Sequence, residues 1–294
     1  MKIYYLSAST VPSRDANSVH VMEMCQAFSR NGHQVSLFGH CSTRNHASIF
    51  DYYDAKFPFD LVVSQDPMIR RLRGVSRLAH VRAMLNRMPA PDIFYARDEW
   101  SLTLAADRGR PFVLEVHSPP SSRLRRTLAK RLVQHPNLAR VVVISEALSA
   151  EYKMIFPFIQ KEKIIVARDG ANIQEEPAKG VLLWPGRENK TQIGYVGSLF
   201  VGRGIDIIIN MARRIPDADF HLVGGRDQDL EDWKKQGLPP NLFFHGHVPH
   251  KLVPSYFSQL DILLAPYQRN VRLVGGLETA KWMSPLKVFE YMAA

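Results

Sequence analysis

The sequence predicts an α/β protein of two domains, each with a parallel sheet that is covered by helices on both faces. Short apolar segments of strand length alternate along the chain with segments of helical periodicity, a pattern typical of parallel sheets. The strand segments are apolar almost throughout, as expected when both faces of a sheet are covered. A chain of 294 residues is also long enough to form two such domains.

The first half of the chain predicts a complete series of strands. They cover residues 3–6, 34–38, 61–64, 93–96, 112–117, 141–144 and 164–167. After the first strand, a polar loop over residues 7–18 leads to a helix over residues 19–30, and Gly32 is its expected C-cap. Ser145 is the expected N-cap of a further helix that runs through Tyr152.

The second half begins after a change in composition. Residues 176–191 hold acidic residues, prolines and glycines with little periodicity, which predicts a linker between domains 1–175 and 192–294. Beyond it we expect strands at 193–196, 220–223, 242–245 and 261–264, alternating with helices at 205–214, 229–236 and 251–258. Ser284 as N-cap and Pro285 at the first position open a last helix. The chain stops inside that helix, so we expect the C-terminal domain to be incomplete.

The charge balance favours an anionic partner. The chain has 38 Lys and Arg residues against 28 Asp and Glu, a formal net charge of +10, which suits a nucleotide, a nucleic acid or an acidic membrane surface. Two cysteines, Cys25 and Cys41, make neither a disulfide framework nor a metal cluster and are typical of a reducing compartment. The N-terminus leads directly into a strand, and no apolar run approaches the ~20 residues of a membrane span. We therefore expect a cytoplasmic protein.

A glycine-rich loop at residues 197–204 is the most informative local feature. It follows a predicted strand and precedes a predicted helix, and it contains Gly197, Gly202 and Gly204. This arrangement presents backbone N–H groups and a helix N-terminus to an anion, usually a phosphate. Arg203 adds a fixed positive charge whose planar fork suits phosphate oxygens. The alternative is a tight turn between two core elements.

Three other polar features bear on the function. His117 ends a predicted strand, and the Arg97–Asp98 pair follows another; ligands bind at such strand ends in open α/β sheets, although a salt bridge would also explain the pair. Asp217 and Asp219 spell a D-x-D metal motif but fall before a strand, which predicts a solvated turn. The loop lacks the third glycine of a dinucleotide fingerprint, and this argues against a dehydrogenase.

Several motifs in order resemble the retaining glycosyltransferases of family 4, also called glycosyl transferases group 1. They are Ala16-Asn17-Ser18-Val19-His20-Val21-Met22, Val143-Ile144-Ser145-Glu146, Tyr195-Val196-Gly197-Ser198-Leu199, Arg203-Gly204-Ile205-Asp206, Phe244-His245-Gly246-His247-Val248 and residues 284–293. The resemblance implies the GT-B fold of two facing Rossmann-like domains. It also implies transfer of a sugar from a nucleotide donor with the anomeric configuration kept. Because Asp217 and Asp219 are expected in a solvated turn, we predict transfer without a metal ion, and no cofactor beyond the nucleotide-sugar substrate is expected.

The resemblance also implies roles for individual residues. Arg203 matches the basic residue that holds the donor diphosphate, Glu290 the glutamate that binds the ribose hydroxyls, and His117 the histidine that faces the donor sugar. The other matching donor-binding positions are Gly197, Ser198, Gly204, Val248, Pro285, Leu286 and Lys287. On the acceptor side, the expected residues are Asn17, Ser18 and Arg97.

Two positions depart from the family pattern. The family often has a basic residue where this chain has Ser198, so one diphosphate contact is missing or is supplied by Lys287. The family also often has two glutamates eight positions apart. Glu290 is the second, but the first falls on Trp282, which accepts no hydrogen bond, and Glu278 is out of register.

Two basic segments predict a docking surface in the N-terminal domain. Residues 69–88 contain no acid, and residues 123–131 repeat the style; the basic residues of the first segment are Arg70, Arg71, Arg73, Arg77, His80, Arg82 and Arg87. We expect them to bind anionic lipid or an anionic or lipid-linked acceptor, and the alternative is a solvated helix face. No aromatic residues lie between the arginines of the first segment, which argues against nucleic acid.

The leading hypothesis is therefore a hexosyltransferase that acts in the assembly of cell-surface polysaccharide or glycoconjugates, as a peripheral protein at the inner face of the membrane. Nucleotide-sugar 2-epimerases share the architecture and are the second enzyme class to consider. A non-catalytic nucleotide-binding module or an inactive fragment is the remaining alternative.

Overall fold

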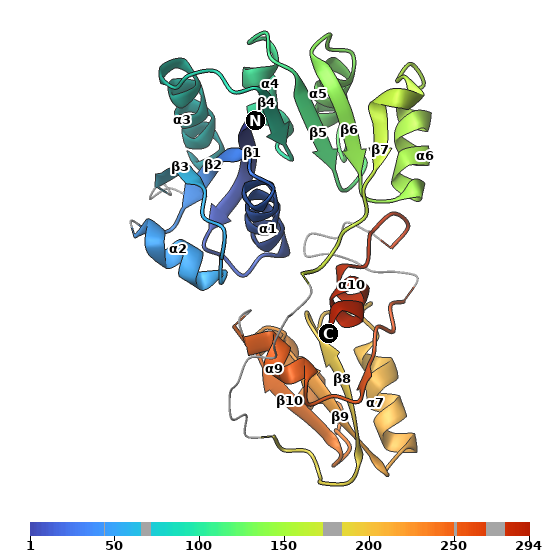
Figure 1. Ribbon diagram of the computed structural model, residues 1–294. Coiled ribbons are helices and arrows are strands. Elements are labelled where there is room, and N and C mark those ends of the chain that lie inside the picture. The colour runs from blue at the N-terminus through green and yellow to red at the C-terminus, as the bar shows by residue number, and fades with distance from the viewer. Residues whose placement is uncertain (44, 66–71, 173–183, 250–251, 269–279) are drawn as a thin grey trace. The chain divides into compact units, whose positions relative to one another are not determined.

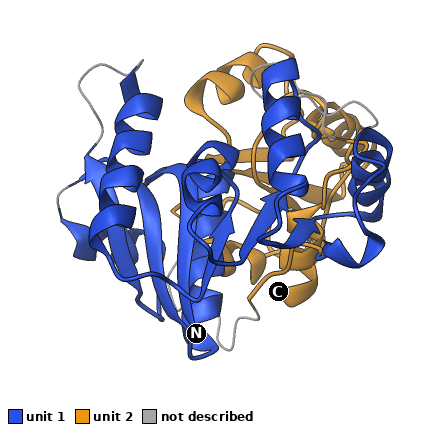
Figure 2. Cartoon of the chain, turned by 90° about the horizontal axis from the view of Figure 1, so that it is seen from above, with its two compact units in different colours: residues 1–167 blue, residues 168–294 orange. Residues whose placement is uncertain are grey.

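The computed structural model describes residues 1–43, 45–65, 72–172, 184–249, 252–268 and 280–294. The chain divides into two compact units, Met1–Ala167 and Arg168–Ala294, which Figure 2 shows in different colours. Residues 176–183 of the predicted linker lie outside the described residues.

Unit 1 contains a seven-stranded sheet in which every neighbouring pair is parallel (Figure 1). The spatial order is β3-β2-β1-β4-β5-β6-β7, which reverses direction between β1 and β4. The strands are β1 Lys2–Val11, β2 Gln34–Cys41, β3 Asp60–Gln65, β4 Ile93–Ala96, β5 Phe112–Val116, β6 Leu138–Val143 and β7 Ile164–Val166. Each predicted strand of this half is present, so the alternation of apolar and helical segments was enough to predict the strands of this sheet.

The predicted polar loop over residues 7–18 is wrong at both ends. Strand β1 continues to Val11, which pairs with Cys41 of β2, and Ser7 and Ser9 are buried within it. This strand end was not predicted because serines at positions 7 and 9 interrupt the apolar pattern. The backbone N–H of Ser9 donates a hydrogen bond to the Ser7 hydroxyl, so these polar side chains are satisfied within the strand. At the other end, helix α1 already begins at Ala16.

Six α-helices of unit 1 lie among the described residues. They are α1 Ala16–Arg30, α2 His46–Tyr52, α3 Arg73–Arg87, α4 Glu99–Ala106, α5 Arg123–Val133 and α6 Glu146–Ile155. The predicted N-cap is confirmed, because the Ser145 hydroxyl accepts a hydrogen bond from the N–H of Leu148 at 3.2 Å. Helix α4 was missed; the side chain of Asp98 caps it by accepting a hydrogen bond from the N–H of Ser101.

A buried ion pair joins α3 to α4. Arg77 donates hydrogen bonds to the carboxylate of Asp98 and, at 2.6 Å, to the hydroxyl of Ser101. Arg77 and Asp98 are both buried, and an interior charge is tolerated when it is paired and hydrogen-bonded. The prediction that Arg77 belongs to a basic surface is therefore wrong. Asp98 pairs with this arginine of α3 rather than with its neighbour Arg97.

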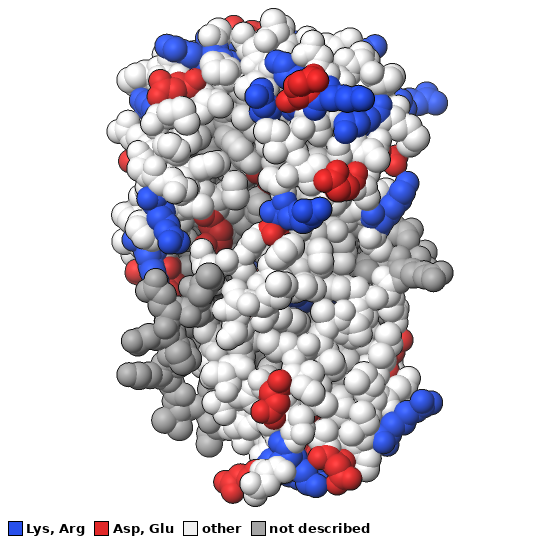
Figure 3. Space-filling view, turned by 45° about the vertical axis from the view of Figure 1, so that its right-hand side comes forward, with Lys and Arg blue, Asp and Glu red and all other residues white. Residues whose placement is uncertain are grey.

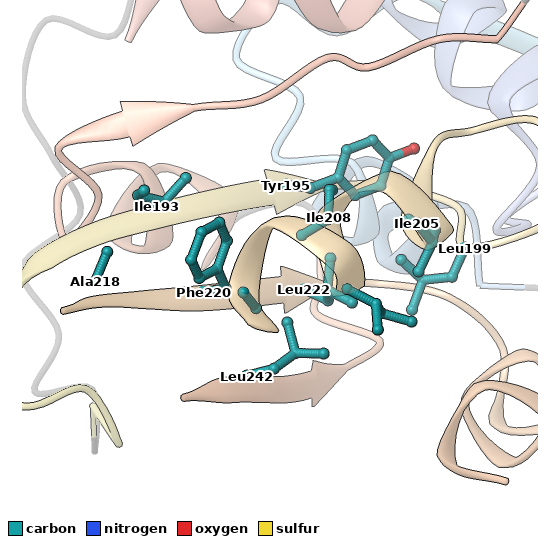
Figure 4. Close-up of a cluster of buried hydrophobic side chains, with 11 residues drawn as sticks. Ile193, Tyr195, Leu199, Ile205, Ile208, Ala218, Phe220, Leu222 and Leu242 are labelled. Carbon is teal, nitrogen blue, oxygen red and sulfur yellow. The ribbon is translucent and has the colours of Figure 1, made fainter. Parts of the chain in front are cut away.

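Unit 2 contains a four-stranded parallel sheet in the order β10-β9-β8-β11. Its elements are β8 Thr191–Val196, α7 Ile205–Arg214, β9 Ala218–Val223, α8 Asp227–Lys234, β10 Leu242–Gly246, α9 Val253–Phe257, β11 Ile262–Leu263 and α10 Leu286–Ala293. Figure 4 shows the core on one face of this sheet, where Ile205 and Ile208 of α7 lie over Tyr195, Phe220 and Leu222. This core fixes the loop that precedes α7 against the end of β8.

Two local predictions in unit 2 are corrected. Ser284 does not cap α10; its hydroxyl accepts a hydrogen bond from the N–H of Asp169, and the helix begins at Leu286. Of the two aspartates in the D-x-D motif, only Asp217 lies in a solvated turn, where it forms an ion pair with Lys190. Asp219 is fully buried in β9, where its carboxylate accepts hydrogen bonds from the backbone and the side chain of Arg187. The sequence alone does not distinguish a buried aspartate that is paired with an arginine from an aspartate that binds a metal ion.

Two neutral histidines on the second face of this sheet predict an acid-sensitive unit. His221 and His245 lie 3.0 Å apart through their ring nitrogens and stack on Trp184, and burial lowers the pKa of each to about 4. Unfolding returns each pKa to about 6.5, so the unfolded chain binds more protons between pH 6.5 and 4. We expect stability to decrease as the pH falls through that window, by about 1–2 kcal/mol after solvent screening.

Chemical denaturation of the wild type and of His245→Phe at pH 7, 5.5 and 4.5 measures this effect. The variant keeps an aromatic ring beside Trp184 and should lose less stability on acidification. An equal loss in both proteins would show that other groups cause the acid sensitivity.

Candidate functional site

Glycines mark the carboxyl ends of three adjacent strands in unit 2. Gly197 follows β8, Gly224 follows β9 and Gly246 ends β10. The N–H of Gly197 donates to the carbonyl of Val223 at 2.7 Å, and a Cβ on Gly224 would collide with the carbonyl oxygen of Gly197. The backbones approach this closely because no side chain intervenes, and the N–H of Gly224 likewise donates to the carbonyl of Gly246. The strand ends thus form a closely packed edge without side chains, the glycine edge.

Arg203 lies in the predicted loop beside this edge. Its guanidinium carbon is 4.8 Å from the ring centre of Phe200 and 5.1 Å from that of Tyr267. Its Nε is buried and has no hydrogen-bond partner in the described part of the chain, where no carboxylate forms an ion pair with Arg203. Aromatic rings hold a guanidinium in place without neutralising it. Arg203 is therefore an oriented cation whose charge remains available to an anion.

Lys287 of α10 brings a second cation to the same place. Its amine donates a 2.6 Å hydrogen bond to the carbonyl of Val196, and a Cβ on Gly197 would collide with it. Desolvation lowers the pKa of Lys287 to about 8; Glu290 raises that pKa and Arg203 lowers it further. Lys287 was predicted as a substitute for the basic residue that the family often has at the position of Ser198. The structure places its amine beside Gly197, the first glycine of the loop.

The remaining predicted donor-side residues surround this pair of cations. Glu290 is close enough to Lys287, Tyr267 and Tyr291 to affect their pKa values. Pro285 and Leu286 lie at the start of α10, which the hydroxyl of Tyr291 ties to Val196. Val248 is buried against Val196 and Val223, Ser198 is exposed, and Gly204 precedes α7 with φ 80°. Glu278 lies outside the described residues.

A second cluster lies in unit 1, where β5 ends. His117 follows β5 directly, Glu115 lies within it, and His20 belongs to α1. Both histidines place Nε2 against the same carboxylate oxygen, Oε1 of Glu115, and the distance for His20 is 2.7 Å. Their rings are perpendicular, with centres 4.9 Å apart. Residues two apart on a strand share a face, so the Glu-x-His spacing brings Glu115 and His117 together.

Charge balance in this cluster keeps Glu115 ionised. Burial alone would raise the pKa of Glu115, but hydrogen bonds from His117 and His20 hold it well below its usual range. Burial lowers the pKa of His117, and the nearby charge of Arg97 lowers it further. The sequence interpretation missed Glu115 and His20 as site residues. A charged residue inside the otherwise apolar strand 112–116 was the available signal.

The predicted acceptor-side residues have different surroundings. Asn17 lies about one turn before His20 on α1, and its side-chain amide donates a hydrogen bond to the hydroxyl of Ser9. Ser18 is buried and its hydroxyl donates to the carbonyls of Ser13 and Asp15, which fixes the turn before α1. Arg97 follows β4, and its charge acts on His117.

Among the helices that the structure describes, none is long and apolar enough to cross a membrane.

Comparison with known proteins identifies two family models and a large set of solved structures. The model Glycosyltransferase Family 4 matches residues 18–175, and the model Glycosyl transferases group 1 matches residues 190–294. None of the curated proteins that were compared with the sequence is similar enough to count as a match.

The similar structures share the fold at low sequence identity. Sucrose-phosphate synthase from Thermosynechococcus elongatus is 15% identical, with a TM-score of 0.62, over 90% of this chain and 75% of that one. The lipopolysaccharide outer core galactosyltransferase WaaB is 15% identical, with a TM-score of 0.59, over 100% and 78%. UDP-GlcNAc 2-epimerase from Neisseria meningitidis is 11% identical, with a TM-score of 0.55, over 90% and 77%. The predicted GT-B fold class is confirmed, with parallel sheets of seven and four strands.

Proposed function

The chain belongs to glycosyltransferase family 4, and on that premise we propose that it transfers a hexose to its acceptor with retention of the anomeric configuration. Membership of the family makes it a glycosyltransferase that uses a nucleotide-sugar donor. The proposal adds that no metal ion or cofactor takes part, and that the product is a cell-surface polysaccharide or glycoconjugate.

One observation carries the proposal: two cations converge on the glycine edge of unit 2. Arg203 has no carboxylate partner among the described residues, and Lys287 reaches the end of β8. A donor diphosphate gains negative charge as its bond to the sugar breaks. Cations fixed at that position stabilise the transition state more than the ground state, which is how they raise the rate.

The other residues receive binding roles in this proposal. Glu290 accepts hydrogen bonds from the ribose hydroxyls, and the start of α10 at Pro285 and Leu286 turns the positive end of a helix dipole toward the diphosphate. The backbone at Val248 contacts the base. His117 orients the donor sugar, and Asn17 and Arg97 are assigned to the acceptor side, where Ser18 serves by fixing the turn before α1.

Donor binding is the first test of the proposal. We expect one of a panel of UDP-, GDP- and ADP-sugars to raise the melting temperature, because a ligand that binds only the folded state stabilises it by mass action. A differential scanning measurement at 1 mM of each nucleotide sugar reads this directly, and Arg203→Ala is the matched control that should not respond. The absence of a shift with every donor, together with binding to single-stranded DNA, would favour a nucleotide or nucleic-acid binder instead.

The 2-epimerase alternative shares only the fold with this chain. Product analysis separates the two reactions: a transferase joins the sugar of the active donor to an acceptor, whereas an epimerase converts it without any acceptor.

The basic helices of unit 1 support a membrane-side location. Helix α4 packs between α3 and α5. Arg82 and Arg87 of α3 are exposed, and so are Arg123, Arg125, Arg126 and Lys130 of α5 together with Leu124. Figure 3 shows basic side chains gathered in the upper part of the view, where unit 1 is drawn. Arg70 and Arg71 lie outside the described residues. We propose that the face formed by α3 and α5 binds anionic lipid.

Vesicle co-sedimentation at physiological salt tests this surface. We expect more protein to pellet with vesicles that contain anionic lipid than with neutral ones, and the double variant Arg125→Glu/Arg126→Glu to lower that binding about tenfold or more, since each basic residue near the surface contributes about 1 kcal/mol. The control Lys234→Glu/Lys235→Glu changes charge equally on exposed residues of unit 2. Equal pelleting with neutral and anionic vesicles rejects the proposal.

A further inference from the structure

We infer that Glu115 and His20 are positioning residues that hold His117 in one tautomer, with the hydrogen on Nε2 and Nδ1 left as a hydrogen-bond acceptor for a donor-sugar hydroxyl. This inference rests on the proposed role of His117 in donor binding. It assigns a function to two residues that the site described so far does not use.

The geometry is a three-residue hydrogen-bonded cluster. Oε1 of Glu115 lies between Nε2 of His20 and Nε2 of His117, and the hydroxyl of Tyr5 lies 3.3 Å from Oε2. Glu115 is only 3% exposed, on a strand whose every residue is buried. Its carboxylate is therefore held rigidly and exchanges little with water, so the two histidines are its main neutralising contacts.

The position of the hydrogens follows from the chemistry of the groups. An ionised carboxylate has acceptor sites and no hydrogen to donate, so each Nε2 in contact with Oε1 must carry a hydrogen. A neutral imidazole has one N–H, and its other nitrogen is then a bare acceptor. None of the described residues forms a hydrogen bond with Nδ1 of His117.

The surrounding charges favour the neutral ring. Burial lowers the pKa of His117, and the positive charge of Arg97 and the neighbouring His20 act in the same direction, against the opposing effect of Glu115. Tyr5, Tyr95 and Cys25 also face this cluster, and burial raises the pKa of each well above its usual value, so all three are neutral at pH 7. His117 therefore has one N–H, on Nε2, and that N–H is already bound to Glu115.

This assignment narrows what His117 recognises. A neutral ring with a bare Nδ1 accepts a hydrogen bond from a hydroxyl, but it has no hydrogen to offer a phosphate oxygen. The structure therefore favours a contact with the sugar of the donor over a contact with its diphosphate. Without Glu115 the ring would be free to adopt either tautomer, and the acceptor would be present in only part of the molecules.

A divalent metal is the competing occupant of this cluster. The three ligand atoms lie within 4.8 Å of one another, and two imidazoles with a carboxylate suit zinc. A metal would require each Nε2 to direct a lone pair at a common point. Here both nitrogens instead lie at hydrogen-bond distance from one oxygen. The experiment therefore includes zinc as a direct challenge.

The tautomer is read by NMR of protein labelled with ¹⁵N-histidine, with the His117 signals assigned from their loss in His117→Ala. At pH 7.5 we expect a protonated Nε2 and an unprotonated Nδ1 for His117, and a shift toward a tautomer mixture in Glu115→Gln. One equivalent of Zn²⁺ should leave the wild-type signals unchanged. A hydrogen on Nδ1 of His117, an unchanged tautomer in the folded Glu115→Gln variant, or loss of the Nε2–H signals with zinc would overturn the inference.

Kinetics separate this positioning role from a merely structural one. With the active donor, Glu115→Gln should lower kcat/KM about 10- to 100-fold, while its affinity for free UDP or the corresponding nucleotide stays at the wild-type value, because the nucleotide lacks the sugar. His20→Gln keeps a hydrogen-bond donor to Glu115 and should lose less, which provides a second variant if Glu115→Gln unfolds. Equal losses in nucleotide affinity and in kcat/KM would point to a damaged fold. If no donor is active, the proposed function fails, and the NMR result still decides the tautomer.

Discussion

Replacement of Arg203 by alanine is expected to lower kcat/KM for the nucleotide sugar about 10- to 150-fold. This corresponds to about 1.5–3 kcal/mol, the range for a hydrogen-bonded contact that involves a charged group. The guanidinium lies against the rings of Phe200 and Tyr267 and forms no ion pair within the described residues, so its charge is not neutralised by the fold. Both the KM for the donor and kcat should change, because the diphosphate is bound in the ground state and gains charge in the transition state.

Two further variants make the Arg203 experiment specific. Arg203→Lys keeps the charge but loses the planar fork, so we expect an intermediate loss. Arg213→Ala removes an arginine of the same helix region, α7, whose side chain donates to the carbonyls of Gln236 and Gly237 on the surface. Steady-state kinetics with the active donor should leave Arg213→Ala near the wild type. Wild-type kinetics in Arg203→Ala would remove the diphosphate role.

The fold was accessible from the sequence because the information lies in local periodicity. Residues 205–214 were predicted as a helix with the bounds that α7 has, since isoleucines recur there on one face and Gly204 precedes them. Helix α4 was missed because apolar residues lie on several of its faces, as expected for a helix packed between two others. Helix type could thus be predicted for α7, where one face is buried, and not for α4, where burial surrounds the helix.

The candidate site was accessible only in part, because its second cluster depends on long-range pairing. Arg203 and Lys287 were predicted as site residues from a loop pattern and from a motif near residue 290, and the structure brings them to one place. Glu115 and His20 lie 95 residues apart, and nothing in local periodicity brings them together. The parallel pairing of β1 with β4 and of β4 with β5 is what places the end of β5 beside α1. The available sequence feature was a glutamate inside an apolar strand, because a buried carboxylate requires hydrogen-bonding or charged partners such as these histidines.

Replacement of Lys287 by methionine is expected to have the largest effect on catalysis, a loss of about 100-fold or more in kcat/KM. The amine lies against the first glycine of the loop and supplies a charge that Ser198 does not. Because its pKa is about 8, the charged form that binds the diphosphate is lost as the pH rises through 8. In the wild type, donor affinity should therefore fall between pH 7 and 9, and in Lys287→Met this dependence should disappear.

The stability of the same variant should change in the opposite direction. The folded chain lowers the pKa of Lys287 from its usual 10.5 to about 8, so the unfolded state binds more protons between pH 10.5 and 8. Below pH 8 both states carry the charge, and its full desolvation cost opposes folding. Holding the charge in the partly buried position thus weakens folding, and Lys287→Met should unfold at equal or higher denaturant concentration, with a gain of about 1 kcal/mol.

Lys234→Met, on an exposed face of α8, is the matched control and should change neither quantity. Gly197→Ala should reproduce the catalytic loss, because its Cβ would occupy the position of the amine. If Lys287→Met gains stability and loses activity, the position of Lys287 is explained by its function and not by packing. If Lys287→Met loses stability and keeps its activity, Lys287 is a structural anchor of α10 and the diphosphate site must depend on Arg203 without it.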